Sequence, residues 1–150
     1  MLLRSPALLS SLALCLACTA TAVSAQQSAE SAAREPGASV SPNGLVYRSL
    51  QDGSGASPKP SDRVRVHYRG TLPDGTEFDS SYKRNAPAEF ALDRVIPCWT
   101  EGVARMKVGG KAKLTCPPAM AYGARGTPGG PIPPNATLFF EVELLGVTAR

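Results

Sequence analysis

The chain has 150 residues, of which 43% are apolar and 19% are charged, and its formal net charge is +4 at neutral pH. This length and composition fit a single soluble globular domain and exclude a chain that is disordered throughout. The basic residues are scattered, so the small positive charge indicates a solvated surface and argues against a nucleic-acid-binding protein.

Residues 1–25 predict a signal peptide. Arg4 precedes an apolar run over 7–20, and the small residues Val-Ser-Ala follow at 23–25, a pattern typical of a secretory signal with cleavage after Ala25. The apolar run is shorter than the ~20 residues needed to cross a bilayer, so a stable membrane span is not expected. We therefore expect an exported, periplasmic protein.

The cysteines agree with export. Cys15 and Cys18 lie within the signal, and neither has a clean lipoprotein-processing pattern, so a lipid anchor at Cys18 is only a minor alternative to release. The mature chain then keeps Cys98 and Cys116. In an oxidising compartment an isolated pair favours a disulfide, with two buried free thiols as the alternative.

Residues 26–42 predict a flexible leader, because they contain almost no large apolar side chain. The folded domain is expected over 43–150, beginning with a short strand at 44–50 and a loop rich in Gly, Ser and Pro. The strongest strand signal follows at 63–72, where apolar and polar residues alternate. His67 lies on the charged face of that strand, which favours a solvated strand residue over a catalytic base or metal ligand.

Two shorter strands and one helix come next. A PDG turn at 73–75 leads into a strand at 76–81, and another strand is expected at 88–92. Residues 96–106 predict the helix, because Pro97 suits its first turn and a Gly-Gly pair stops it. The helix has an apolar stripe of Trp99, Val103 and Met106.

The last part contains two strands separated by a long loop. Residues 111–117 alternate so that Cys116 points inward, and it could meet Cys98 if the start of the helix crosses this strand. Residues 118–136 are rich in Gly and Pro and have no periodicity, and loops of this length in compact domains are usually functional. A strand at 137–147 ends the pattern. The elements predict an α+β fold in which an antiparallel sheet of about five strands covers one short helix.

Polar chemistry is sparse. The mature chain has a single histidine, no Cys-x-x-Cys and no phosphate-binding glycine loop, so we expect no metal and no cofactor. Asp79 stands inside a strand between Phe78 and Ser80. If it is buried it needs a partner, for which Arg84 is the candidate; an exposed Asp in a turn is the alternative.

Five segments, at 44–53, 66–81, 94–114, 121–126 and 132–145, resemble the FKBP-type peptidyl-prolyl cis-trans isomerases in order and spacing. The resemblance implies a sheet wrapped around one short helix, and an enzyme that accelerates rotation about Xaa-Pro bonds during the folding of exported proteins. It also implies an apolar aromatic pocket with Trp99 as its floor and Tyr122 donating to a substrate carbonyl. By this resemblance the catalytic residues are Tyr68, Phe78, Asp79, Tyr122 and Phe140, the substrate-binding residues are Val95, Ile96, Trp99 and Ile132, and Arg84 supports Asp79.

The resemblance also implies partners. These are proline-containing unfolded or partly folded polypeptides and macrolide inhibitors. Separately, because the chain lacks an added helical dimerisation arm, we expect a monomer. Three features depart from the family: Ala88 replaces a large aromatic, residues 127–131 differ, and Cys98 replaces a glycine. Two other readings stay open at this point. One is a binding module or holdase that binds unfolded chains without catalysing their isomerisation. The other is a thiol-disulfide protein that uses Cys98 and Cys116.

Overall fold

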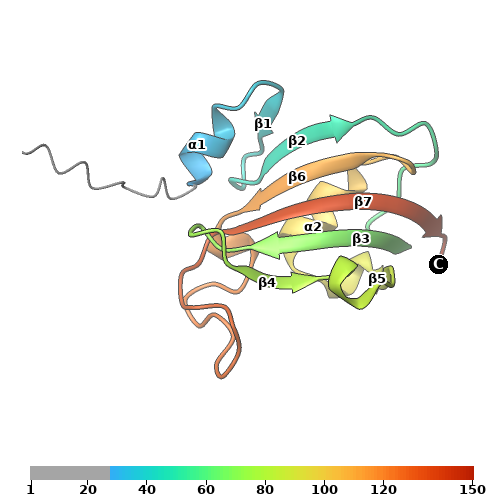
Figure 1. The fold of residues 1–150 in the computed structure, drawn as a ribbon. Coiled ribbons are helices and arrows are strands. Elements are labelled where there is room, and N and C mark those ends of the chain that lie inside the picture. Colours follow the sequence, from blue (N-terminus) through green and yellow to red (C-terminus); the bar gives the residue numbers. More distant parts are fainter. Residues whose placement is uncertain (1–27) are drawn as a thin grey trace, which may run out of the picture.

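The computed structural model describes residues 28–150, so the predicted signal peptide lies outside the described residues. These residues form one antiparallel sheet with a helix packed on one face (Figure 1), which confirms the predicted α+β class. The sheet has seven strands where about five were expected, in the order β1-β2-β6-β7-β3-β4, with β5 also pairing with β3. The elements are α1 (Ala29–Ala33), β1 (Ala38–Val40), β2 (Val46–Gln51), β3 (Arg63–Thr71), β4 (Glu77–Ser80), β5 (Ala88–Ala91), α2 (Pro97–Ala104), β6 (Lys111–Cys116) and β7 (Leu138–Thr148).

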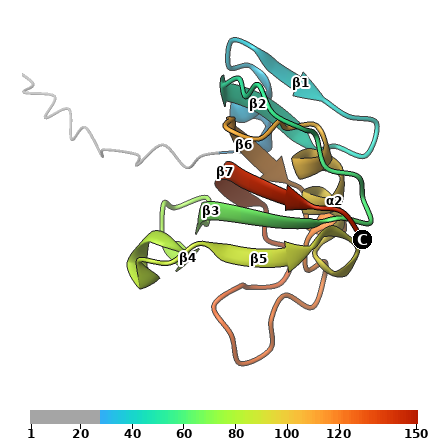
Figure 2. The ribbon, with the colours of Figure 1, turned by 90° about the vertical axis from the view of Figure 1, so that its right-hand side faces the viewer.

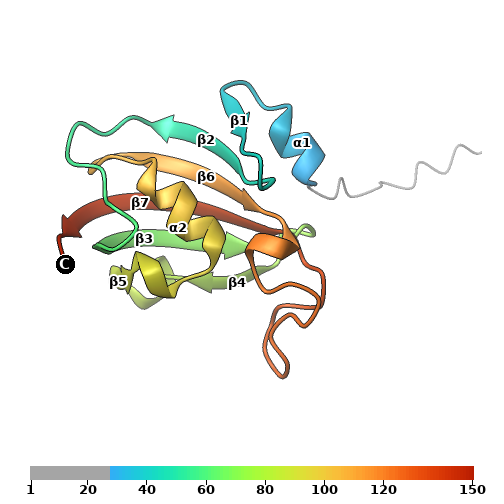
Figure 3. The same ribbon diagram turned by 180° about the vertical axis from the view of Figure 1, so that it is seen from behind.

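Strand β7 is the centre of the sheet, because it pairs with β6 along one edge and with β3 along the other. The alternation predicted for β3 is present: Val64, Val66 and Tyr68 are buried, whereas the residues between them are exposed or partly exposed. The inner face packs against α2, which crosses the sheet in Figure 3 and lies to one side of it in Figure 2. Fully buried aliphatic side chains form this core, among them Leu45, Val64, Val66, Leu92, Val103, Leu114, Leu138, Val142 and Leu144.

Helix α2 is fixed to β6 by close packing and by a covalent bond. A Cβ atom at Gly102 would lie 2.8 Å from Cδ2 of Leu114, so glycine is what allows the helix to approach this closely. At the start of the helix, Cys98 forms a disulfide with Cys116, with 5.6 Å between their Cα atoms. The structure therefore has the disulfide that the sequence favoured over free thiols.

The expectation of a flexible leader over 26–42 is wrong for residues 28–40, which contain α1 and β1. Ser28 and Ser31 cap each other's backbone N–H groups at the start of α1, so two serines do what a Ser-Glu capping box usually does. Ala32 packs with Val46 and Phe139 on the outer face of the sheet, opposite α2. Strand β1 then pairs with β2. Because this pairing uses backbone groups, it produces no hydrophobic pattern in the sequence.

The long segment between β6 and β7 has one short 3-10 turn, Pro118–Met120, and otherwise no regular structure. In Figures 1 to 3 it projects beyond the sheet on the side of β4. This confirms the irregular loop predicted over 118–136. Within residues 28–150, no helix has both the length and the apolar character that a membrane crossing requires.

Candidate functional site

A cavity of about 490 Å³ opens between the inner face of the sheet and the start of α2. Its lining brings together every pocket residue that the family resemblance implied except Ile132. Phe90 and Arg94 also line it, and neither was predicted. The lining residues are Tyr68, Phe78, Asp79, Phe90, Arg94, Val95, Ile96, Trp99, Tyr122 and Phe140.

Trp99 forms the floor of this cavity and is only 4% exposed. Three aromatic rings, those of Tyr68, Phe90 and Phe140, stand nearly perpendicular to the indole, with centroids 5.2 to 5.4 Å away. Such edge-to-face contacts fix the indole in one orientation. Phe78 in turn packs edge-on against Phe140, with centroids 5.6 Å apart. The floor and walls are therefore a rigid, apolar set of rings.

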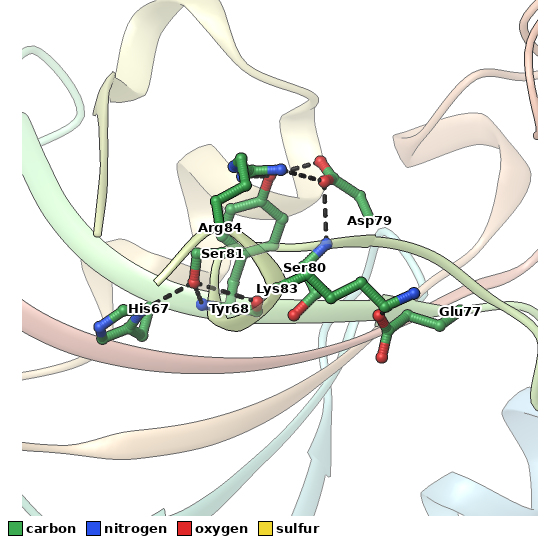
Figure 4. A network of polar contacts seen from close by, with 8 residues as sticks. All are labelled: His67, Tyr68, Glu77, Asp79, Ser80, Ser81, Lys83 and Arg84. Carbon is green, nitrogen blue, oxygen red and sulfur yellow. Dashed lines mark hydrogen bonds and ion pairs between the residues drawn. The ribbon is translucent and has the colours of Figure 1, made fainter. Parts of the chain in front are cut away.

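One corner of the cavity is polar, and Asp79 is at its centre (Figure 4). The Tyr68 hydroxyl donates to Oδ2 of Asp79, and Arg84 donates from Nη1 to Oδ1 over 2.7 Å. The backbone N–H of Ser80 donates to the same Oδ1 over 2.8 Å, and Arg84 also reaches the Tyr68 oxygen over 3.0 Å. The predicted Asp79–Arg84 pair is thus present, and both carboxylate oxygens are satisfied.

The surroundings of Asp79 keep it ionised. Burial alone would raise the pKa of its carboxyl, but the hydrogen bonds from Tyr68 and Arg84 outweigh burial, so the pKa lies below its ordinary value of 3.8. Burial, followed by the hydrogen bond to Asp79, raises the pKa of the Tyr68 phenol above 10.0. At neutral pH the corner therefore holds a carboxylate and a protonated phenol.

Ser81 positions this corner from behind. Its buried hydroxyl accepts the backbone N–H of Tyr68 over 2.8 Å, and its own N–H donates to the Tyr68 carbonyl over 3.0 Å. These bonds join β3 to the 3-10 turn Tyr82–Arg84, which carries Arg84. His67 contacts the same hydroxyl over 2.8 Å (Figure 4). Its ring stacks on that of Tyr82, and it does not belong to the lining of the cavity. The prediction of a strand residue on the outer face is therefore confirmed for His67.

Two residues of the lining were missed for identifiable reasons. Phe90 lies two residues after Ala88 on β5, so it projects to the same face, but a strand of four residues is too short for its alternation to mark the inner face. Arg94 is exposed and follows no periodic pattern. Ile132, in contrast, is 5% exposed and belongs to the core beside the cavity, where its backbone bonds to Thr127 hold the long loop.

Gly70 was also missed, although it shapes the cavity. A Cβ atom there would lie 2.5 Å from Cζ of Phe78 and 3.0 Å from Cε1 of Phe140, so both rings occupy space that any side chain would fill. Its place two residues after Tyr68, on the inner face of β3, is the signal that could have found it.

The chemistry available in this cavity is binding and exclusion of water. Among residues 28–150 there is no group of three or more His, Cys, Asp or Glu side chains placed to hold a metal ion. Asp79 already accepts three hydrogen bonds from the protein. What the walls offer a ligand is a concave apolar surface with one negative corner, which suits a compact nonpolar ring attached to a polar chain.

Comparison with known proteins identifies relatives of this arrangement. A family model described as FKBP-type peptidyl-prolyl cis-trans isomerase matches residues 55–145. The FKBP-type peptidyl-prolyl cis-trans isomerase FkpA of Escherichia coli strain K12 is 56% identical over 118 residues, which cover 79% of this chain and 43% of the relative. The FKBP-type 22 kDa isomerase of the same organism is 51% identical over 118 residues, covering 79% and 57%.

Solved structures give the same result. The crystal structure of FkpA from E. coli superposes with a TM-score of 0.77 at 55% identity, covering 81% of this chain and 56% of that one. A peptidyl-prolyl isomerase from Pseudomonas syringae gives a TM-score of 0.74 at 38% identity, covering 80% and 87%. This chain spans about half the length of the curated relatives that it matches.

Proposed function

This chain belongs to the FKBP-type peptidyl-prolyl cis-trans isomerase family, and we propose that its domain over 43–150 accelerates rotation about Xaa-Pro peptide bonds in exported polypeptides that are still folding. The observation that carries this proposal is the cavity itself: a buried indole floor, three rings around it and the ionised Asp79 in its polar corner. No proton transfer is required of it.

The physical argument begins with the amide. Partial double-bond character gives the C–N bond a rotation barrier of ~18–20 kcal/mol, and twisting the bond removes the resonance and much of the amide dipole. A proline ring bound over Trp99 brings the adjoining amide out of water into apolar surroundings. The twisted amide, being less polar, loses less on leaving water than the planar amide does, so the cavity binds the transition state more tightly than the ground state.

The residues of the cavity divide into three roles in this proposal. Trp99 and Phe78 hold the proline ring, with Phe140, Val95, Ile96 and Phe90 completing the apolar wall. Asp79, kept ionised by Tyr68 and Arg84, presents a fixed negative charge to the substrate from the one polar corner. The hydroxyl of Tyr122, whose side chain is 43% exposed at the rim, donates to a substrate carbonyl.

A peptide assay of cis-to-trans conversion, run on residues 26–150, tests this function. Wild-type protein should accelerate conversion, and Phe78→Ala and Asp79→Ala should each lower kcat/KM by at least about tenfold, since each removes a contact to the reacting group. The matched control is Tyr82→Ala, which removes an exposed ring outside the cavity. Wild-type protein that binds the peptide without accelerating conversion would support a holdase instead, and a macrolide that fails to compete would argue against this site.

We further propose that the protein works in the periplasm as a monomer. The signal-like residues 1–25 and the Cys98–Cys116 disulfide both support an oxidising, extracytoplasmic compartment. Thiol labelling of native material should modify neither cysteine without prior reduction. Labelling of both cysteines in unreduced material would contradict this assignment, and a dimer peak in light scattering would contradict the monomer.

A further inference from the structure

Arg94 is a cation at the wall of the cavity with no carboxylate of its own. It is exposed and lines the cavity together with Asp79 and Tyr122. Within residues 28–150, two acidic groups close to it already have partners: Asp79 pairs with Arg84, and Asp93 pairs with Arg150. No ion pair or side-chain hydrogen bond of Arg94 is present in the same part of the chain.

The partners of Asp79 leave no role for Arg94 there. Tyr68, Ser80 and Arg84 supply its hydrogen bonds, and the charges that shift its pKa include Arg84 but not Arg94. Asp79 is therefore the negative group of the lining and is already paired with Arg84, whereas the guanidinium of Arg94 is a second, positive group of the lining that has no such partner among residues 28–150.

The backbone at Arg94 is held in place. It ends the short 3-10 turn Leu92–Arg94, whose first residue is fully buried. The N–H of Leu92 donates to the carbonyl of Asp62 over 3.0 Å, and the hydroxyl of Thr100 donates to the Leu92 carbonyl over 2.5 Å. The next two residues, Val95 and Ile96, line the cavity and lead into α2. The guanidinium is thus carried by a rigid turn directly beside the place proposed for the proline ring.

We infer that Arg94 is a specificity-determining residue that recognises an acidic side chain on a residue adjoining the substrate proline. A guanidinium offers several N–H donors in a fixed plane and binds carboxylates in preference to neutral groups. A polypeptide with its proline ring over Trp99 must carry its flanking residues past the cavity wall. This inference rests on the proposed isomerase function, and it narrows the substrate to Xaa-Pro segments with Asp or Glu next to the proline.

The experiment compares three peptides that differ only in having Glu, Gln or Lys beside the proline, with the change made on either side of the proline in two separate series. Both kcat/KM and peptide affinity are measured, the latter from the fluorescence of Trp99, the only tryptophan in the chain. The variants are Arg94→Gln, Arg94→Lys and Arg94→Glu. The matched control is Arg65→Gln, because Arg65 is an exposed arginine on the opposite face of β3.

In at least one series, wild-type protein should prefer Glu over Gln by about two- to five-fold, the range expected for an exposed ion pair. The preference should fall to about one in Arg94→Gln, persist in part in Arg94→Lys, reverse in Arg94→Glu and weaken at high salt. Arg65→Gln should leave it unchanged. Equal handling of Glu and Gln on both sides, or a preference that survives Arg94→Gln, would overturn the inference.

The two readouts separate this inference from the proposed function. If no peptide is turned over, the isomerase proposal fails, and the charge preference is still decided by the affinities. If all peptides are turned over at equal rates and bound with equal affinity, only the role of Arg94 fails.

Discussion

The Cys98–Cys116 disulfide should contribute about 3 kcal/mol to the free energy of unfolding, a contribution that reduction would remove. The two cysteines are separated by 18 residues in sequence. In the chain-entropy treatment, closing a loop of that size lowers the entropy of the unfolded chain by roughly 11 cal/mol/K, which corresponds to about 3 kcal/mol at 25 °C. Both side chains are fully buried, so replacing them with alanine adds a packing loss.

Urea unfolding followed by Trp99 fluorescence measures this contribution to the free energy of unfolding. Trp99 is a suitable reporter because it directly follows Cys98 on α2. Three forms are compared: oxidised wild type, reduced wild type and the Cys98→Ala/Cys116→Ala double variant. Reduced wild type keeps both sulfur atoms and loses only the cross-link. With a slope of about 1.5 kcal/mol/M for a domain of this size, its midpoint should fall by roughly 2 M urea.

The folded protein should keep its isomerase activity without the cross-link, since the disulfide acts mainly on the unfolded chain. Trp99 would still be held by its three neighbouring rings. Oxidised and reduced wild type with the same urea midpoint would refute the entropic argument. Loss of activity in reduced protein that is still fully folded would show instead that the disulfide shapes the cavity.

Four further predictions concern the two faces of the sheet. Between about pH 5 and pH 9, kcat/KM should not change through titration of Asp79 or Tyr68, because their pKa values lie below 3.8 and above 10.0 respectively. A loss of activity with an apparent pKa between 5 and 7 that is absent in Asp79→Asn would contradict this prediction. The stabilisation that comes from the lowered pKa of Asp79 is present above its unfolded-state pKa and should be lost only as pH falls through the lower folded value, as acid unfolding of Asp79→Asn and wild type would show. Gly70→Ala should displace the ring of Phe78 and lower kcat/KM by more than about tenfold, at a stability cost of about 1–3 kcal/mol, and a fully active variant would refute the close packing. Phe139→Ala should destabilise the fold by about 3 kcal/mol in urea while leaving the kcat/KM of the folded protein unchanged, because this side chain packs on the outer face; a large loss of kcat/KM in folded protein would contradict that.

The elements with regular burial were the ones that the sequence predicted well. Strand β3 alternates because one face packs on α2 and the other meets solvent, so its pattern is visible in any window of the sequence. The leader shows the opposite case. Helix α1 buries only Ala32, and β1 is held by backbone pairing with β2, so neither element produces a periodic hydrophobic pattern in the sequence. Tertiary contacts with Phe139 and Val46 order residues whose own composition predicts disorder.

The residues of the site likewise include some that the sequence predicted and some that it did not. Periodicity placed Trp99 on the inner face of a helix, but only the family resemblance implied that it is the floor of a cavity and not ordinary core. The Asp79–Arg84 pair followed from the need of a lone carboxylate for a partner. Neither route predicted Gly70 or Arg94, although the alternation of β3 does place Gly70 on its inner face. Gly70 matters because it leaves space for the rings of Phe78 and Phe140, and Arg94 matters because it lines the cavity without an ion-pair partner among residues 28–150. Both properties depend on contacts that exist only in the folded chain.

The central claim is that the cavity over Trp99 lowers the barrier to Xaa-Pro rotation. Exchange NMR on a proline peptide at equilibrium tests it most directly, because the method observes cis and trans forms interconverting without a coupled enzyme. Uncatalysed exchange takes tens to hundreds of seconds. With a small amount of protein, cis–trans exchange peaks should appear within about a second, weaken strongly in Asp79→Ala and persist in Tyr82→Ala. A peptide that quenches Trp99 fluorescence on binding and yet shows no exchange peaks would contradict the claim.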